Sequence, residues 1–581
     1  MTSFFASPSM RYLRDRFTDL YGEAAAGRCL DRLAMMIGRY GVGGVEPRPA
    51  REKWTQNDAI LITYADMVRD PPRAPLRVLK GFADARLRDV FSTLHVLPFF
   101  PSSSDDGFSV IHYRHVDPDL GTWEDVSALG QHFQLMVDMV LNHVSSHSNW
   151  FEDFRTGTAP GRHYFMEVDP GTDLSGVVRP RTHPLLTRVY TRSGDRHVWT
   201  TFSADQVDLN YANPDVLFEI LDLLLFYTSM KARIFRLDAI AYLWKQVGTP
   251  CIHLPQTFGI VRLMREFLRV VAPDGLLLTE TNVPHEENIR YFGQGDAAHM
   301  VYQFSLPPLV LDALLQGDAR WLTAWAGRLQ APPAGCTFLN FTASHDGIGV
   351  RPLQGLVPDA RVEALAAHIR RRGGAVSMKR NPDGSESPYE LNCTWFDAMG
   401  RGSEPDSLHV ARFLCSQTLP LALQGIPAVY FHSLTATPND TEEVRRTGRA
   451  RSLNRGRWDL ADLDARLSDA ATVTARVFAE LVRRLRVRRG HPAFHPNAGQ
   501  EVLDAGDRAF CLLRRPAGPQ PPLLALANVT DGAVTLPAEF LRKAWGSQDC
   551  LEDILAPGTF HETGEPLPLA PYQCAWLSVS P

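Results

Sequence analysis

Eight short apolar runs recur along this 581-residue chain, and stretches with helical periodicity lie between several of them. Runs of this length that are apolar on both faces are typical of parallel strands covered by helices. Two of the intervening stretches, "VLFEILDLLLFYTSM" and "FGIVRLMREFLRVV", have helical spacing. We therefore expect an α/β fold in which eight βα units close into a (β/α)8 TIM barrel. The eight apolar runs lie at residues 59–66, 91–100, 132–143, 232–241, 275–282, 299–307, 336–346 and 426–433.

The barrel does not account for the whole chain, and the pattern predicts three parts in order. Residues 1–55 form an N-terminal helical extension, residues 56–497 the catalytic barrel, and residues 498–581 a small antiparallel β domain with short alternating runs. Two intervals inside the barrel are too long for simple crossovers. We expect an inserted B domain at 146–230, after the third strand, and an inserted loop region at 347–425, between the seventh and eighth strands. The pattern leaves open whether the extension caps the barrel or builds a homodimer interface.

Composition excludes several classes of protein. The net charge of −5 argues against a nucleic-acid binder, which usually carries a basic excess. The first residues contain charges and no apolar core, and no window approaches a membrane span, so we expect neither a secretory signal nor a membrane anchor. The eight cysteines form no CxxC pair, which favours reduced thiols in the cytoplasm.

One predicted strand, "FRLDAIAYLW", contains charges that a buried strand should avoid. Arg236 and Asp238 are two residues apart and therefore point to the same face. A structural ion pair is one interpretation of this stretch. The other is a functional site, because three further strands also end in charged or polar side chains, and barrels of this type place their active sites at that rim. Those residues are Asp138, Asn142 and His143 after the third strand, Glu280 after the fifth, and His345 and Asp346 after the seventh.

These segments, with "QVDLN" at 206–210, resemble the signature segments of the α-amylase superfamily of glycoside hydrolases and transglycosylases (glycoside hydrolase family 13). The resemblance implies that Asp238 is a nucleophile forming a glycosyl ester, with Arg236 orienting it and keeping its pKa low. It implies that Glu280 is the general acid and then the general base, while Asp346 holds the sugar 2- and 3-hydroxyls. A retaining enzyme needs two such carboxyl groups about 5–5.5 Å apart, one ionised and one protonated. The histidines implied to bind glucosyl hydroxyls are His143 and His345.

Further stretches resemble the sucrose phosphorylase group of that superfamily. "LITYAD" begins the barrel, "LPFFPSSSDDGFSVIHYRHVDPDLGTWEDV" follows the second strand, and "SHDGIGV" follows the seventh. By resemblance, Asp105 and Phe108 wall a pocket for one glucose, Gln206 also lies there, and Arg455 pairs with Asp105 at the pocket floor to bind the 4-hydroxyl. The reaction of the group is phosphorolysis, in which phosphate rather than water attacks the glycosyl ester and yields α-glucose 1-phosphate. The partners implied are a small α-glucoside and inorganic phosphate, without a cofactor.

The loops on the acceptor side depart from sucrose phosphorylases. Arg181 matches the phosphate-contacting Arg of the group, but Val178 stands where those enzymes carry Tyr. In "ESPYELNCTW", which contains Tyr389, Glu390 stands where they carry a Gln that faces fructose. With the N-terminal extension, these loops resemble the glucosylglycerate phosphorylase branch. The alternatives are a sucrose phosphorylase, an α-glucosidase or transglucosylase, and a catalytically inactive amylase-like binding subunit, the last disfavoured because all three carboxylates are present.

A metal site is not expected. His143 and His147 have the spacing of two helical zinc ligands, but no further ligand follows in the HExxH manner. The resemblance points the same way, because calcium binding is common in the superfamily through Asn142 but not in the phosphorylase group.

Overall fold

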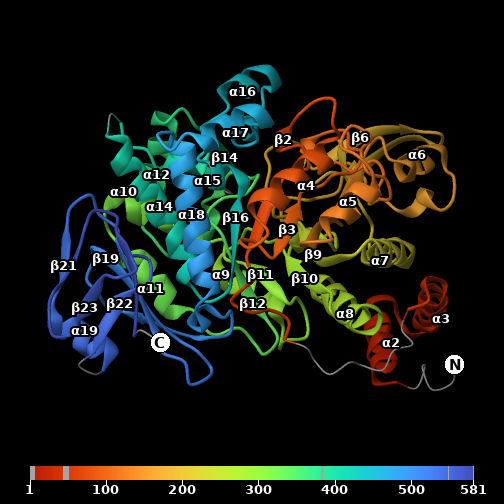
Figure 1. Cartoon of the computed structure of the whole chain (residues 1–581). Helices are drawn as coiled ribbons and strands as arrows, with labels where there is room; N and C mark the ends of the chain where they lie inside the picture. Colours follow the sequence, from red (N-terminus) through yellow and green to blue (C-terminus); the bar gives the residue numbers. More distant parts are fainter. Residues whose placement is uncertain (1–6, 43–51, 381–384, 403, 547–548, 580–581) are drawn as a thin grey trace.

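A computed structural model of the chain describes residues 7–42, 52–380, 385–402, 404–546 and 549–579 (Figure 1). Its centre is a closed barrel of eight parallel strands, and each strand lies within one of the eight apolar runs, so the predicted TIM barrel is confirmed. Its strands in chain order are β1 (Ile60–Thr63), β3 (Thr93–Val96), β4 (Gln134–Val140), β9 (Ala232–Asp238), β10 (Leu276–Thr279), β11 (Met300–Tyr302), β12 (Thr337–Asn340) and β16 (Ile426–Tyr430).

The strands are apolar along their length because they are covered on both faces. Every residue of β1, β3, β10 and β12 is buried, between the side chains that fill the barrel and the helices outside it. The register sets the position of charged groups: Asp138 of β4 lies opposite Arg236 of β9. The larger helices around the barrel are α4 (Pro75–Arg86), α5 (Trp123–Leu129), α7 (Pro214–Ser229), α8 (Pro255–Val271), α10 (Leu306–Gln316), α11 (Arg320–Arg328), α14 (Asp406–Ala422) and α18 (Val473–Arg489).

The excursion after β4 consists of small sheets and one helix. Its elements are β5 (His143–Ser145), α6 (Asn149–Thr156), β6 (Leu186–Thr191), β7 (Gly194–Trp199) and β8 (Gln206–Asp208). β5 pairs with β8 and β6 with β7, both antiparallel. α7, which begins at Pro214 behind the N-cap Asn213, packs beside barrel strand β9. The last part of the interval 146–230 is therefore a barrel helix.

The excursion between β12 and β16 builds a three-stranded sheet in the order β13-β15-β14. β13 directly follows the seventh-strand segment "SHDG", so this sheet begins at the rim of the barrel. Its elements are β13 (Ile348–Gly349), η5 (Arg351–Leu353), α12 (Asp359–Arg371), β14 (Ala375–Arg380) and β15 (Glu386–Asn392). After β16 come α15 (Phe431–Thr435), α16 (Thr441–Thr447), the 3-10 turn η6 (Ala450–Asn454) and α17 (Leu460–Ser468).

The C-terminal part is an antiparallel sheet in the order β18-β19-β20-β25-β22-β23, with a second pair, β21 and β24. Buried arginines join it to the barrel: Arg514 of β19 donates to the carbonyl oxygens of Ala422 at 2.6 Å and His495 at 3.0 Å. The strands are β18 (Gly499–Leu503), β19 (Ala509–Arg515), β20 (Leu523–Asn528), β21 (Val534–Leu536), β22 (Cys550–Asp553), β23 (Phe560–Glu562), β24 (Leu567–Leu569) and β25 (Cys574–Ser578), with helix α19 (Ala538–Trp545).

The N-terminal helices α2 (Pro8–Tyr21) and α3 (Glu23–Tyr40) lie along the outside of the barrel, at the opposite end of the molecule from the C-terminal sheet (Figure 1). α2 packs along α8, and Phe17 stacks on Phe218 of α7 with ring centroids 5.7 Å apart. The Tyr21 hydroxyl donates to the backbone oxygen of Tyr211 at 3.1 Å. In the described residues, no helix combines the length and apolar character that crossing a membrane requires.

Candidate active site

One cavity at the C-terminal rim of the barrel receives most of the predicted site residues. Asp238 ends β9, Glu280 directly follows β10, and Asp346 lies in the loop after β12, so three strand ends bring three carboxyl groups to one cavity. Arg236 and Arg455 lie behind its wall. The other predicted residues that line the cavity are Asp105, Phe108, His143, Arg181, Gln206, His345, Tyr389 and Glu390.

Arg236 is paired on both sides, which answers how a buried strand can carry it. One guanidinium nitrogen donates to Asp238 at 2.8 Å and to Asp138 at 2.5 Å, and all three side chains are almost fully buried. Asp138 also lies 2.7 Å from His95 Nε2. A buried guanidinium requires such partners, because an unpaired buried charge is costly. Asp138 and His95 therefore hold Arg236 against Asp238.

The two carboxyl groups nearest β9 differ in their surroundings. Burial raises the pKa of Glu280 to about 7; the Arg236 charge opposes the shift, and the Asp238 and Asp346 charges add to it. Burial also raises the pKa of Asp238, although Arg236 opposes it, so the expectation that Arg236 keeps that pKa low is wrong. Desolvation outweighs the ion pair because the carboxyl group is enclosed by other residues at the rim of the barrel. Asp238 is bonded directly to a cation, whereas Glu280 accepts a hydrogen bond from Ala239 N–H at 3.0 Å.

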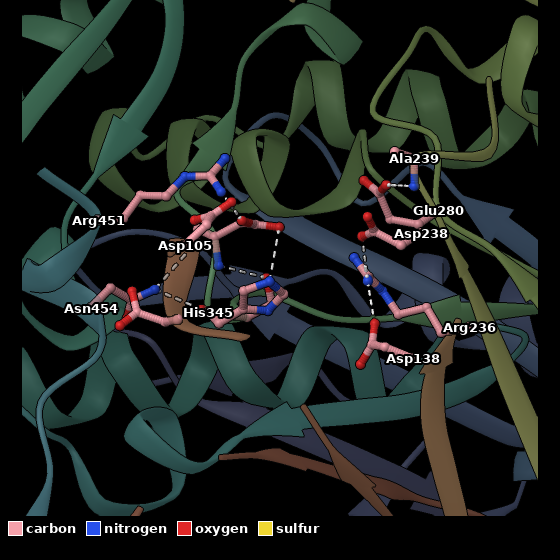
Figure 2. Close-up of polar contacts among 12 residues, drawn as sticks. Asp105, Asp138, Arg236, Asp238, Ala239, Glu280, His345, Arg451 and Asn454 are labelled. Atoms are coloured by element: carbon pink, nitrogen blue, oxygen red, sulfur yellow. Dashed lines mark hydrogen bonds and ion pairs between the residues drawn. The ribbon is translucent and has the colours of Figure 1, made fainter. Parts of the chain in front are cut away.

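Asp346 is held in a strongly cationic setting. Partial burial would raise its pKa, but Arg451, His345 and Arg455 hold the pKa of that carboxyl well below its usual range. Arg451 lies 2.5 Å from Asp346 Oδ1, and Asn454 donates to the backbone oxygen of Asp346 at 3.1 Å. Figure 2 shows Arg451 and Asn454 on the side of the site opposite Asp238 and Glu280, with His345 between. Asp346 is therefore ionised at neutral pH.

The floor of the predicted glucose pocket contains the expected pair of Asp105 and Arg455, at 3.5 Å. The same guanidinium nitrogen forms a closer ion pair with Asp106. Asp105 also accepts from Gln206 Nε2 at 3.3 Å and lines the cavity. Asp106 is the residue that sequence reasoning missed here. The Asp105 carboxylate is only partly buried, so it remains available to a ligand.

The turn that carries these aspartates is strained. Asp105 and Asp106 have φ of 54° and 48°, and Gly107 has φ of 108°. Positive φ is unfavourable for residues other than glycine, and such strain clusters at functional sites. A Cβ at Gly107 would lie 2.5 Å from the Pro98 carbonyl oxygen, so only glycine fits. The next residue, Phe108, is thereby placed with its ring stacked on His345, centroids 4.7 Å apart and planes 6° apart.

A cluster of serines fastens this turn to the inserted B region. The Asp205 carboxylate accepts hydrogen bonds from Ser103 at 2.5 Å, Ser109 at 2.7 Å and Ser146 at 2.6 Å, as well as from Ser104. Although burial opposes it, these bonds lower the pKa of Asp205 to about 2. In the chain, Ser104 precedes the cavity residue Asp105, and Asp205 precedes the cavity residue Gln206. Gln206 Nε2 lies 3.2 Å from His143 Nε2. The serine run of "SSSDDGFS" thus positions one wall of the pocket.

The acceptor side contains Arg181, Tyr389, Glu390 and Arg451. Arg181 lines the cavity and Arg179 does not. Among the described residues Arg181 has no ion pair within 4.0 Å, so its charge is open to a ligand. Glu390 is buried and receives two hydrogen bonds from Arg451, at 3.0 and 2.6 Å. Arg451 is a second residue that the sequence analysis missed; the only signal was its place four residues before Arg455 in "RSLNR".

The glycines of "SHDGIGV" are explained by close packing. A Cβ at Gly347 would lie 2.6 Å from the side chain of Glu390, and one at Gly349 would lie 2.2 Å from Asn282. Larger residues would push the loop carrying Asp346 away from β15, which carries Glu390. The glycines therefore let the seventh-strand loop and the acceptor loop meet.

A buried lysine side chain lies at the base of the B region. Lys245 is buried, and its ammonium lies 2.6 Å from Asn142 Oδ1 and 2.7 Å from Asp208 Oδ2. This ion pair joins the end of β4 to β8 and to the segment after β9. In the described residues, no group of three or more His, Cys, Asp or Glu side chains is arranged to hold a metal ion.

The comparisons with known proteins agree with the geometry of the site. The alpha-amylase model, described as "Alpha amylase, catalytic domain", matches residues 90–326. Glucosylglycerate phosphorylase of Allomeiothermus silvanus is 48% identical over 488 residues, 83% of this chain and 86% of that protein. Sucrose phosphorylase of Agrobacterium vitis is 30% identical over 478 residues, 78% of this chain and 91% of that protein. The crystal structure of sucrose 6F-phosphate phosphorylase from Thermoanaerobacter thermosaccharolyticum aligns with a TM-score of 0.72 and 23% identity, over 91% of this chain and all of that one.

Proposed function

The chain belongs to the glycoside phosphorylases of the α-amylase family, and from this premise we propose that it is a glucosylglycerate phosphorylase. It transfers the glucosyl group of glucosylglycerate to inorganic phosphate and releases α-glucose 1-phosphate and glycerate. The observation that carries the choice of acceptor is the higher identity to the glucosylglycerate phosphorylase, 48%, than to the sucrose phosphorylase, 30%.

The proposed first step forms a glucosyl ester on Asp238. Its carboxylate, oriented by Arg236, attacks the anomeric carbon as the bond to the glycerate oxygen breaks. Glu280 gives its proton to that oxygen, which suits a carboxyl group whose pKa is about 7. Asp346 stays ionised, binds the sugar hydroxyls and stabilises the positive charge that develops on the sugar ring. Glycerate then leaves with the proton.

The second step is proposed to reverse this chemistry with phosphate. A phosphate oxygen attacks the anomeric carbon, the ester bond to Asp238 breaks, and ionised Glu280 takes the proton of a protonated phosphate oxygen. Two inversions leave the α configuration unchanged. Phosphate arriving here meets the ionised carboxylates of Glu280 and Asp346, so it needs a cation, and Arg181 is available on the acceptor side.

Arg181 is proposed to serve both acceptors. Phosphate and the glycerate carboxylate are small oxyanions, and the planar guanidinium fork can bind two oxygens of either. Tyr389, half-buried in the cavity wall, lies close enough to Arg181 for that charge to lower the pKa of the phenol, although burial raises it. One cation would then hold the phosphate in one direction and glycerate in the other.

The glucose side supports a substrate with one glucosyl unit. Asp105, Phe108, Gln206, His143 and His345 surround the cavity next to Asp238. The Phe108–His345 stack and the Arg455–Asp106 pair close the pocket behind them. We propose that Asp105 and the two histidines bind the glucosyl hydroxyls and that this wall excludes longer sugar chains.

The test of function is a panel of acceptors with α-glucose 1-phosphate as donor, read by phosphate release. We expect glycerate to release phosphate faster than fructose, glycerol or water. Fructose as the best acceptor would indicate a sucrose phosphorylase, and equal release without any acceptor would indicate a glucosidase. No release, and no cleavage of glucosylglycerate with phosphate, would indicate an inactive subunit.

Cellular location and assembly are part of the proposal. We place the enzyme in the cytoplasm because all eight cysteines are free thiols. The inner faces of α2 and α3 are buried on the barrel, so a homodimer through the N-terminal helices would use their outer faces, where Met35 of α3 is exposed. Light scattering of the full chain measures the assembly.

A further inference from the structure

Arg451 pairs with carboxylates on both sides of the cavity. It lies in η6, and its three guanidinium nitrogens are all used: one lies 2.5 Å from Asp346, and the other two donate to Glu390 at 3.0 and 2.6 Å. Asp346 comes from the loop after β12, and Glu390 comes from β15. The guanidinium thus bridges a glucose-side group and an acceptor-side group.

The bridge is rigid because its neighbours are also held. Asn454, three residues on in the same turn, donates to the backbone oxygens of Ser344 at 2.6 Å and Asp346 at 3.1 Å. Arg455 donates to the His345 oxygen at 3.0 Å. The segment 451–455 therefore holds the seventh-strand loop through hydrogen bonds to its backbone oxygens. Arg451 adds a contact to the carboxylate of Asp346.

A lysine could not replace this arrangement. An ammonium is a point charge, whereas the flat guanidinium presents nitrogens in fixed directions and can bind one carboxylate bidentately while touching another. Glu390 is buried, so its charge depends on Arg451, and in return it fixes the plane of the guanidinium that faces Asp346. Removal of Arg451 would leave Asp346 and Glu390 as two like charges in one cavity.

We propose that Arg451 is a positioning residue of this active site: its guanidinium sets the orientation of Asp346 toward the glucosyl unit, and Glu390 sets the orientation of the guanidinium. Arg451 itself touches neither the anomeric carbon nor the nucleophile. The role of Asp346 rests on the proposed glycosyl-transfer function. The acceptor-side residue Glu390 and the sugar-binding carboxylate of Asp346 are then coupled through the side chain of Arg451.

The test uses α-glucosyl fluoride, because fluoride leaves without help from a general acid and water can complete the turnover. This assay requires Asp238 and Asp346 but no particular acceptor. We expect Arg451→Gln to lower kcat for fluoride release at least hundredfold and Arg451→Lys to lower it about tenfold, with smaller changes in KM. Because a cation no longer faces Asp346, the acid limb of the initial burst of fluoride, which precedes the water step that needs ionised Glu280, should move to higher pH in Arg451→Gln.

Arg361→Gln is the matched control for loss of stability. Arg361 is as exposed as Arg451, 20% against 22%, and also bridges two carboxylates, Asp312 at 3.4 Å and Asp318 at 2.7 Å, away from the cavity. We expect it to lower Tm while leaving kcat and the pH profile unchanged. If Arg451→Gln does not fold, the kcat, pH profile and Tm of Arg451→Lys are compared with those of Arg361→Gln.

Two outcomes overturn the proposal. One is that the folded Arg451 variant keeps more than a third of wild-type kcat. The other is that its loss of activity comes with an unmoved acid limb and follows the fall in Tm as in Arg361→Gln, which marks Arg451 as structural. Fluoride release by the wild type without any cleavage of glucosylglycerate would refute the proposed acceptor and leave the test of Arg451 intact.

Discussion

Arg236 donates from a single nitrogen to Asp238 at 2.8 Å and to Asp138 at 2.5 Å, so the guanidinium in strand β9 is balanced by two carboxylates. Asp138, held by His95, neutralises the cation inside the barrel, while Asp238 lines the cavity, where we propose that it acts as the nucleophile. The following predictions depend on this arrangement and on the groups facing it.

Asp238→Asn should lower turnover by several orders of magnitude while the fold survives. The amide has the size of the carboxylate but cannot form the glucosyl ester, so the two-step path is lost. Steady-state phosphorolysis and circular dichroism measure the two effects. A folded variant with more than about a tenth of the wild-type rate would show that Asp238 is not the nucleophile.

Glucosyl release should depend on phosphate, and the product should be α-glucose 1-phosphate. Phosphate completes the second displacement, and two inversions at the anomeric carbon leave its α configuration unchanged. Proton NMR of the first product identifies its configuration, and a glucose assay in phosphate-free buffer gives the rate with water. The phosphorylase assignment is contradicted if free glucose appears equally fast with and without phosphate.

Arg181→Ala should raise the KM for phosphate at least tenfold, equivalent to about 1.4 kcal/mol, and weaken the use of glycerate. Slow hydrolysis by water should be spared, because water needs no cation. Arg179→Ala is the control, since Arg179 lies two residues away on the same loop but outside the cavity lining. An unchanged phosphate KM together with a lower Tm would make Arg181 a loop support instead.

Cleavage of glucosylglycerate should lose rate as pH rises through about 7, because burial raises the pKa of Glu280 to about 7 and its proton is needed by the leaving glycerate. Fluoride release from α-glucosyl fluoride should lack this basic limb. Glu280→Gln should abolish the first reaction and largely spare the formation of the glucosyl ester in the second. A basic limb that persists in fluoride release would assign it to another group.

The same raised pKa affects stability in a defined direction. The pKa of Glu280 is higher in the folded protein than its ordinary value of 4.5. Its contribution to stability is therefore fully present below about pH 4.5 and is lost as pH rises through about 7. Glu280→Gln should remove this part of the pH dependence of Tm, measured between pH 5 and 8 against wild type. An unchanged pH dependence of Tm would show that Glu280 is not the source.

The sequence pattern was sufficient to predict the barrel and the rim at which its charged strand ends meet, whereas the catalytic roles of those residues are implied by the family resemblance. The apolar runs identify all eight strands because strands that are buried on both faces give short continuous apolar runs bounded by turns, which is a local property of the sequence. The charged strand ends converge because parallel strands in a barrel all finish at one rim, so Asp238, Glu280 and Asp346 could be expected together before any coordinates were known.

Tertiary structure alone decided the ion-pair partners and the electrostatics. Arg455 pairs with both Asp105 and Asp106 and makes its closer contact with Asp106, across 349 residues of chain, where a turn with positive φ at both aspartates meets η6. Arg451 bridges Asp346 and Glu390 only because three separate loops meet, and the pKa of Asp238 rises because burial outweighs Arg236. Periodic patterns reflect short-range geometry, whereas ion pairs and desolvation depend on distances between segments that no local pattern encodes.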